Sequence, residues 1–340
     1  MLTLLLLACA PEAPPAPCPL ATDRYVITED GATIALHHHP GKGPPVILVH
    51  GISSNHTFWD LDEDHSAARW LVRQGFDPWL LDLRGHGNAR TTEDGTPQIS
   101  GWTVDDYGRY DVAAAVSFVQ DVTGYARVGY VGHSMGGMVG GIYVANGGGK
   151  NLSSFVVVGS PATFTKDTKL VRVAMGVLKA AGAGLFWVES GVGGDAAAAL
   201  GPATPGQLQY RLYNRDHFRP ETERRMLRSV ASPMSREEMQ QMGRMIEDER
   251  FESVDRTTDW TAAFHTTNTP VLAIAGGADQ VGRPDWVRPW VAGDPSKYVE
   301  VPGYGHLDLG LGEDAEQDVF PLIGAWLAEH PGERRVPRPE

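Results

Sequence analysis

The chain has 340 residues, of which 42% are hydrophobic and 21% are charged, a balance typical of a soluble globular protein with one large core. It carries 29 basic and 42 acidic residues, giving a formal net charge of −13, and no stretch of its body is dense in lysine or arginine. Nucleic acid is therefore excluded as an expected partner, because binding it requires a basic face that neutralises phosphates.

The N-terminal segment, MLTLLLLACAPEAPPAPCPL, joins a short apolar run to a stretch rich in proline and alanine. The run is too short to span a bilayer. Leu6-Leu7-Ala8-Cys9 resembles a bacterial lipobox, which predicts cleavage before Cys9, lipidation of its thiol and an exported lipoprotein tethered to a membrane. Residues 1–22 are then signal and tether. A Cys9–Cys18 disulfide and a cytoplasmic protein with a chance apolar leader are the alternatives.

The body of the chain alternates between strand-like and helical patterns. RYVITEDGATIALHHHP predicts a hairpin that turns at Asp30-Gly31. The strand-like runs that follow are PPVILVHG, FDPWLLDLRGHG, ARVGYVGHS, SSFVVVGSP, TPVLAIAGGAD and KYVEVPGYGH. The helical stretch DDYGRYDVAAAVSFVQDVTG ends at Gly124, where a C-cap is expected. Apolar strands that alternate with helices indicate a mostly parallel central sheet flanked by helices, with ligands at the carboxyl ends of the strands.

The alternation of strand-like and helical patterns is interrupted once, over a long segment. No strand-like run occurs between Ser160 and Thr258, where the sequence is helical, amphipathic at first and charged later. We predict a helical cap over residues 163–258, inserted into a core made of residues 23–162 and 259–330, with residues 331–340 as a tail. Ordinary core helices are the alternative, because apolar and methionine positions at helical spacing usually mean packing.

A cluster of glycines surrounds Ser134 in YVGHSMGGMVGG. Glycines this dense lower the stability of a regular element, so another requirement must favour them. Gly132-His133-Ser134-Met135-Gly136 matches a nucleophile elbow, in which a serine occupies a strained turn between a strand and a helix. RVGYVGHS supplies the strand and MGGMVGGIYVANGG the helix. The pattern predicts that Ser134 is a nucleophile.

Three further features each follow a strand-like run. The backbone N–H groups of Ile52 and Met135 can converge as an oxyanion hole, Asp279 ends VLAIAGGAD, and His306 lies in PGYGHLDL. A serine needs an imidazole to take its proton, and the imidazole needs a carboxylate that fixes its tautomer. We therefore predict a Ser134–Asp279–His306 triad, with Asp308 as the rival acid.

Other polar residues receive structural interpretations. His37, His38 and His39 are expected on the surface and without a metal, because successive strand residues point to opposite faces. Asp82 and Arg84 are expected to organise the floor of the site, and His133 to pack beneath the elbow. The sequence predicts no metal site and no thiol nucleophile in the folded body.

Together these residues identify a resemblance. Over residues 23–330 the chain resembles serine hydrolases of the α/β-hydrolase fold, and GHSMGG resembles the elbows of bacterial esterases and monoglyceride lipases. The layout around LVHGISSNHTFWD and the elbow is similar to the acid lipase family, which has His-Ser-Gln-Gly where this chain has His-Ser-Met-Gly. The resemblance implies an α/β-hydrolase fold, hydrolysis of carboxylic esters through an acyl-serine, and no cofactor.

The expected substrate is a small ester, acyl or lipid-like. Leu178, Phe186 and Trp187 in the predicted cap are candidates for the wall of an acyl pocket. An acyltransferase or thioesterase with the same triad is the alternative, followed by a non-catalytic lipoprotein.

Overall fold

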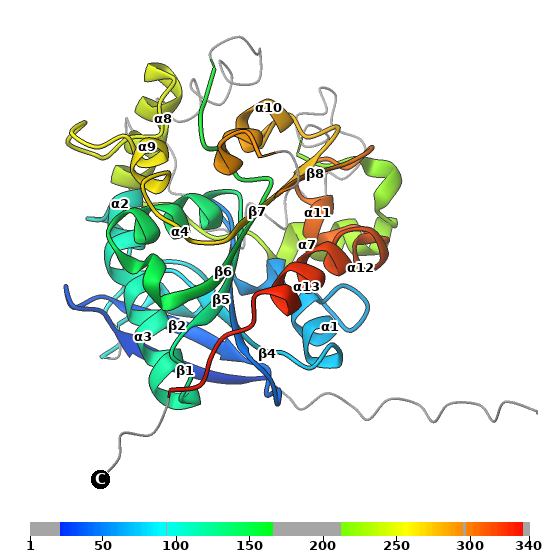
Figure 1. The fold of residues 1–340 in the computed structure, drawn as a ribbon, viewed down its shortest axis with the longest axis horizontal. Helices are drawn as coiled ribbons and strands as arrows, with labels where there is room; N and C mark the ends of the chain where they lie inside the picture. Colours follow the sequence, from blue (N-terminus) through cyan, green and yellow to red (C-terminus); the bar gives the residue numbers. More distant parts are fainter. Residues whose placement is uncertain (1–20, 93, 166–211, 295–296, 336–340) are drawn as a thin grey trace, which may run out of the picture.

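The structure, a computed structural model, describes residues 21–92, 94–165, 212–294 and 297–335. Its centre is an eight-stranded sheet with the order β1-β2-β4-β3-β5-β6-β7-β8 (Figure 1). The strands are β1 (Thr22–Ile27), β2 (Thr33–His38), β3 (Pro45–Val49), β4 (Asp77–Asp82), β5 (Val128–His133), β6 (Leu152–Val158), β7 (Val271–Gly276) and β8 (Tyr298–Val301). β2 pairs antiparallel with β1 and with β4, and every other pair is parallel. The predicted hairpin and mostly parallel sheet are confirmed.

Helices cover both faces of the sheet. One face carries α2 (Val104–Asp106), the π-helical turn η3 (Tyr107–Asp111), α3 (Val112–Thr123), α4 (Met135–Ala145) and α9 (Trp260–Phe264). The other carries α1 (Ala67–Arg73), α11 (Asp308–Leu311), α12 (Ala315–Asp318) and α13 (Phe320–Glu329). Figure 1 shows α3 and α4 on one side of the strands and α1 and α13 on the other. The shorter elements are η1 (His56–Phe58), η2 (Gly87–Arg90), η4 (Gly148–Asn151), α10 (Pro284–Val287) and η9 (Arg288–Val291).

The central strands are buried on both faces, which explains their continuous apolar sequences. In β3, Ile47 and Val49 pack in the cluster beneath α3 and α4, while Val46 and Leu48 pack in the cluster beneath α1 and α13. Each side chain is at most 1% exposed. The alternation follows from the two-residue period of a strand, and a one-residue slip would exchange the two cores.

Gly124 ends α3, as the sequence predicts. Its φ of 71° lies in the left-handed region, and its N–H donates to Gln120 O at 3.0 Å. Glycine adopts this conformation at little cost, so the chain leaves the helix here and turns into β5.

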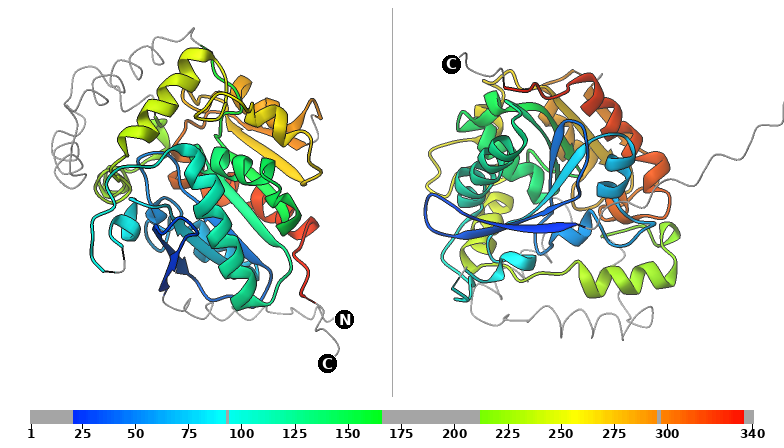
Figure 2. Two further views of the ribbon diagram at one scale, coloured as in Figure 1. Left: turned by 90° about the vertical axis from the view of Figure 1, so that its left-hand side faces the viewer. Right: turned by 90° about the horizontal axis from the view of Figure 1, so that it is seen from below.

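The described part of the predicted cap lies between β6 and β7 in the chain. It contains η8 (Arg215–His217), α7 (Pro220–Ser229) and α8 (Arg236–Asp248). Figure 2 shows α7 and α8, coloured lime to yellow, outside the central sheet. The exact boundaries of a cap domain stay a prediction.

The C-terminal segment packs against the residues that follow α3. Of the predicted tail, Arg335 donates from its backbone to Gly124 O at 2.8 Å, and Arg334 pairs with Tyr125 in an isolated bridge. Among the described residues, no helix is both long and apolar enough to cross a membrane. Cys9 and Cys18 lie outside the described residues.

Candidate active site

Ser134 occupies a sharp turn between β5 and α4. Its φ of 53° and ψ of −122° are unfavourable for a residue with a side chain, as in a nucleophile elbow. Its N–H donates to Val158 O at 2.9 Å, and the Ser160 hydroxyl donates to Ser134 O. A Cβ at Gly136 would lie 2.6 Å from His50 O, so only glycine lets α4 approach the end of β3 this closely. These contacts hold the strained turn in place.

Asp279 and His306 meet at the carboxyl ends of β7 and β8. His306 Nδ1 lies 2.8 Å from Asp279 Oδ2, and both side chains are at most 5% exposed. The nitrogen that faces a carboxylate carries the proton, which leaves Nε2 as an acceptor. Asp279 Oδ1 accepts hydrogen bonds from the backbone of Val281 and Gly282, at 2.7 and 2.8 Å. The carboxylate is therefore fixed at both oxygens.

His133 joins this pair to the elbow. Its Nε2 donates to His306 O at 3.0 Å, its ring centroid lies 4.5 Å from that of His306, and it stacks on Phe58 at 4.0 Å. Burial, and then the repulsion that a protonated His306 would exert, hold the pKa of His133 well below its ordinary value. His133 thus packs beneath the elbow as a neutral ring. Among the described residues, the Ser134 hydroxyl makes no hydrogen bond to His306, and such bonds are often long without substrate.

Asp308, the rival acid, does not face the imidazole of His306. Its oxygens accept hydrogen bonds from the backbone of Gly305 at 2.7 Å and of Asn214 at 3.2 Å. Burial raises the pKa of this carboxyl. Its contacts are those of a residue that shapes the loop before α11.

The β3 loop, residues 50–56, follows β3 and carries Ile52. A Cβ on Gly51 would lie 3.0 Å from Ser134 Cβ, so this loop runs directly beside the elbow. His50 Nδ1 donates to Gly51 O at 2.8 Å, while Nε2 accepts from Leu83 N at 3.3 Å. This tautomer is neutral, in agreement with a pKa that burial lowers to about 3.

A buried network holds the middle of the β3 loop. His86 Nδ1 donates to Ser54 O at 2.8 Å, and Nε2 lies 3.0 Å from the Tyr107 hydroxyl. That hydroxyl accepts from Trp102 Nε1 and donates to Glu238 Oε2 of α8, both at 2.8 Å. Burial alone would lower the pKa of His86, but the nearby Glu238 raises it. These hydrogen bonds connect the β3 loop to α8 through His86 and Tyr107.

The segment after α7 is joined to the same loop. Ser53 Oγ donates to Ser232 O at 2.7 Å, and Ser232 N donates back to Ser53 O at 2.9 Å. Asn55 Nδ2 donates to Ser229 O at 2.9 Å and to Val230 O at 3.2 Å. Residues inserted between β6 and β7 therefore contact the loop that the sequence assigns to the oxyanion hole.

The prediction that His37, His38 and His39 lie on the surface is wrong. His37 is 4% and His39 is 2% exposed, and the His38 side chain is 18% exposed. Each ring faces a carboxylate, which offsets the cost of burial. His37 contacts Asp82 and Asp23, His38 contacts Asp77, and His39 contacts Asp60, at 2.7–3.0 Å. The three rings do not converge.

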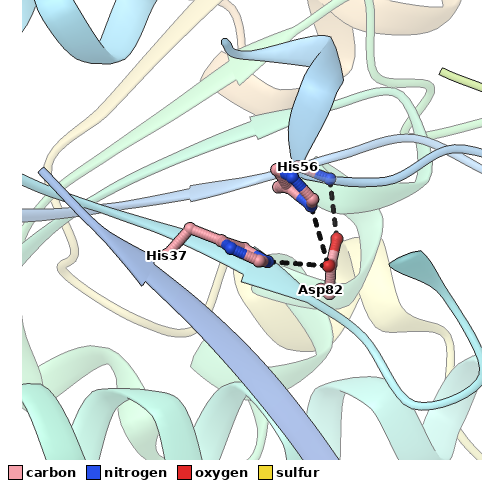
Figure 3. A group of neighbouring side chains, drawn as sticks. All are labelled: His37, His56 and Asp82. Atoms are coloured by element: carbon pink, nitrogen blue, oxygen red, sulfur yellow. Dashed lines mark hydrogen bonds and ion pairs between the residues drawn. The ribbon is translucent and has the colours of Figure 1, made fainter. Parts of the chain in front are cut away.

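His37 instead lies beside His56 and Asp82 (Figure 3). One potential metal-ligand atom from each of the three side chains lies within 4.8 Å of the other two. The two rings stack with centroids 3.6 Å apart and planes 26° apart, so their in-plane lone pairs do not aim at one ion. His37 Nε2 and His56 Nδ1 both lie 2.8 Å from Asp82 Oδ2. The geometry is that of a hydrogen-bonded cluster.

Arg84 does not join this cluster. Its guanidinium pairs with Asp111 of η3 at 2.7 Å and with Asp30 of the hairpin turn at 2.5 Å. Arg84 thus fastens the β1–β2 hairpin to the helical face.

Several expected residues fall outside what the structure describes, and others were not foreseen. Leu178, Phe186, Trp187 and Cys9 lie outside the described residues. The sequence analysis missed Asn55, His56, His86 and Ser160. The Gly85-His86-Gly87 sequence in LRGHGN, after β4, is a signal that could have drawn attention to His86.

Part of the chain is similar in sequence to known lipases. Gastric triacylglycerol lipase of Rattus norvegicus is 32% identical over 128 residues, which are 34% of this chain and 32% of that protein. Human lysosomal acid lipase/cholesteryl ester hydrolase is 30% identical over 133 residues, 35% of this chain and 33% of that protein. The chain thus matches about a third of the length of these curated relatives.

A thermophilic esterase from Thermogutta terrifontis superposes with a TM-score of 0.62 at 22% identity, over 91% of this chain and all of that one, which shows a shared fold. The model of the alpha/beta hydrolase fold family matches residues 44–313, most of the sequence. This chain therefore belongs to the alpha/beta hydrolase fold family.

Proposed function

We propose that this protein is a serine hydrolase that cleaves carboxylic esters with Ser134, His306 and Asp279. The observation that carries the proposal is the hydrogen bond of 2.8 Å between His306 Nδ1 and Asp279 Oδ2, made beside a serine in a strained elbow. Partial sequence similarity to two lipases supports the same reaction class.

The reaction proceeds in two halves. His306 Nε2 takes the proton of the Ser134 hydroxyl as Oγ attacks the ester carbonyl, and Asp279 stabilises the resulting imidazolium. The N–H groups of Ile52 and Met135 stabilise the oxyanion. The C–O bond to the alcohol breaks and His306 gives that alcohol its proton. Water then cleaves the acyl-serine by the same steps and releases the acid.

The proposed substrate is an ester with an acyl chain longer than acetate. The lipase relatives are named for triacylglycerol and cholesteryl esters, and the predicted cap carries Leu178, Phe186 and Trp187 as apolar candidates for an acyl wall. Export and a membrane tether through Cys9 belong to the same proposal, because a lipid substrate lies at a membrane.

The test uses p-nitrophenyl acetate, butyrate and octanoate with the full chain, and labelling by a fluorophosphonate. Ser134→Ala should lose both activity and labelling, with kcat lower by about 10⁶-fold. The matched control is Ser154→Ala on β6, because that buried hydroxyl has no hydrogen-bond partner among the described residues. Activity retained by Ser134→Ala would refute the proposal. Added acceptor alcohols reveal a transferase if ester products replace the free acid.

A further inference from the structure

Asp82, at the carboxyl end of β4, is a buried carboxylate with an unusual number of hydrogen bonds. It is 0% exposed. Oδ1 accepts from the backbone of His56 at 2.7 Å, while Oδ2 accepts from His56 Nδ1, His37 Nε2 and the backbone of Asn88, each at 2.8 Å. Figure 3 shows the two imidazoles directed at this one carboxylate. Burial alone would raise its pKa, but the bonds from His37 and His56 hold the pKa of Asp82 well below its ordinary value.

Two of those four hydrogen bonds come from His56, the last residue of the β3 loop. The loop leaves β3, passes Ser134 at Gly51, continues through Ile52 and ends on Asp82. Ser53 within it has a φ of 53°, which is costly for a residue with a side chain and persists only where neighbours enforce it. Asp82 is thus the anchor at the far end of a strained loop whose near end touches the nucleophile.

The charged and titratable groups around this anchor come from every neighbouring element. Asp23 of β1 lies 2.7 Å from His37 Nδ1, so His37 is held between two carboxylates. His50, at the end of β3, and His86, after β4, contact the same loop at Gly51 and Ser54. Neither hydrogen-bonds to Asp82 among the described residues, so the Asp82 carboxylate acts on the loop through His56.

We propose that Asp82 is a positioning residue for ester hydrolysis. It holds the β3 loop so that the Ile52 N–H is already aimed at the oxyanion before that charge develops. This inference rests on the proposed function. Preorganised donors of this kind stabilise the transition state more than the bound ester, so the role of Asp82 should appear in kcat rather than in KM.

The test is Asp82→Asn in the full chain. The amide oxygen can still accept from the His56 backbone, but an NH2 group in place of Oδ2 cannot accept from the Asn88 backbone or from His56 Nδ1. The matched control is Asp77→Asn at the amino end of the same strand. Asp77 is also buried, at 6% exposed, and also pairs with an imidazole, that of His38 at 2.7 Å.

The measurements are kcat and KM for p-nitrophenyl butyrate, and Ki for an aryl boronic acid that forms a tetrahedral adduct with the serine. Asp82→Asn should lower kcat by about 10- to 100-fold with KM unchanged, and raise Ki by a similar factor. Asp77→Asn should leave all three within about twofold. Ki does not depend on how much of the sample is folded, so it separates positioning from simple destabilisation.

The proposal is overturned if Asp82→Asn keeps kcat within about twofold of wild type, if Ki stays unchanged while kcat falls, or if Asp77→Asn loses as much. Should Asp82→Asn fail to unfold cooperatively, His56→Ala decides by the same criteria, since the His56 side chain is 23% exposed and its loss is tolerable. Failure of the proposed function looks different, because Ser134→Ala would then bind the boronic acid as well as wild type does.

Discussion

Replacing Asp279 by asparagine tests the assignment of the acid through a predictable change of tautomer. Two backbone donors, Val281 N and Gly282 N, hold Oδ1, so the asparagine oxygen should stay there. Its NH2 group then takes the place of Oδ2, 2.8 Å from His306 Nδ1. A donor at that point forces Nδ1 to accept, so the imidazole proton moves to Nε2. In that tautomer His306 cannot take a proton from Ser134.

The expected loss in kcat is about 10⁴-fold, the effect of this substitution in a comparable triad. It corresponds to about 5 kcal/mol of transition-state stabilisation. The assay is steady-state hydrolysis of p-nitrophenyl butyrate. Because the amide is nearly isosteric and keeps the two backbone hydrogen bonds, the thermal midpoint should change little.

Asp308→Asn is the control, two residues beyond His306. Its carboxylate accepts hydrogen bonds from the backbone of Gly305 and Asn214, and His217 Nδ1 lies 3.3 Å from Oδ2. Losing one of those acceptors costs about 1–3 kcal/mol of folding free energy. A protein stable by about 5–15 kcal/mol remains folded, so kcat should stay within about twofold. An active Asp279→Asn beside an inactive Asp308→Asn would refute the reasoning and move the acid role to Asp308.

Two further predictions rest on the structure and two on the sequence. Tyr107→Phe removes a hydroxyl with three buried partners and should lower the urea unfolding free energy by about 1–3 kcal/mol, whereas Tyr125→Phe should change it by under about 0.5 kcal/mol. The pKa of His37 is raised above its ordinary 6.5, because hydrogen bonding to Asp82 and the charges of Asp82 and Asp23 outweigh burial, so its stabilisation is complete below that pH and is lost as pH rises through the raised pKa. Urea denaturation of wild type and of His37→Asn from pH 5 to 9 should therefore show a difference in unfolding free energy that shrinks as the pH rises. A difference that stays constant with pH would contradict this titration. Cys9→Ser should release the protein from membranes with kcat unchanged, and a wild type that is wholly soluble with an unmodified N-terminus would exclude lipidation. Phe186→Ala should flatten the rise in kcat/KM from acetate to octanoate esters, and a series unchanged by the substitution would remove the acyl wall.

The fold was accessible to sequence analysis because its signals are local. Apolar runs such as VILV in β3 and VVV in β6 are continuous since both faces of these strands are buried, and glycines mark the elbow and the end of α3. The order of Ser134, Asp279 and His306 at successive strand ends also follows from such signals, because parallel strands bring their carboxyl ends to one edge.

The contacts that sequence analysis missed come from residues distant in the chain. His37 looks like a surface residue until β1 and β4 bring Asp23 and Asp82 to its two nitrogens. Asn55 looks like a helix cap, and it does accept from Thr57 N, but its amide group also donates to Ser229 at the end of α7 and to Val230. Such pairings depend on register and loop paths, to which neither periodicity nor spacing is sensitive.

The place of the insertion affects when activity can arise during synthesis. β6 and β7 pair side by side in the sheet, yet residues 159–270 separate them in the chain. A nascent chain that has left the ribosome as far as α9 holds Ser134 and its elbow but neither Asp279 nor His306, which follow β7 and β8. Pairing across so long a connection is slow compared with local folding. Under the proposed mechanism, Ser134 is therefore inactive until the C-terminal strands add to the sheet, and an incomplete chain has no hydrolase activity.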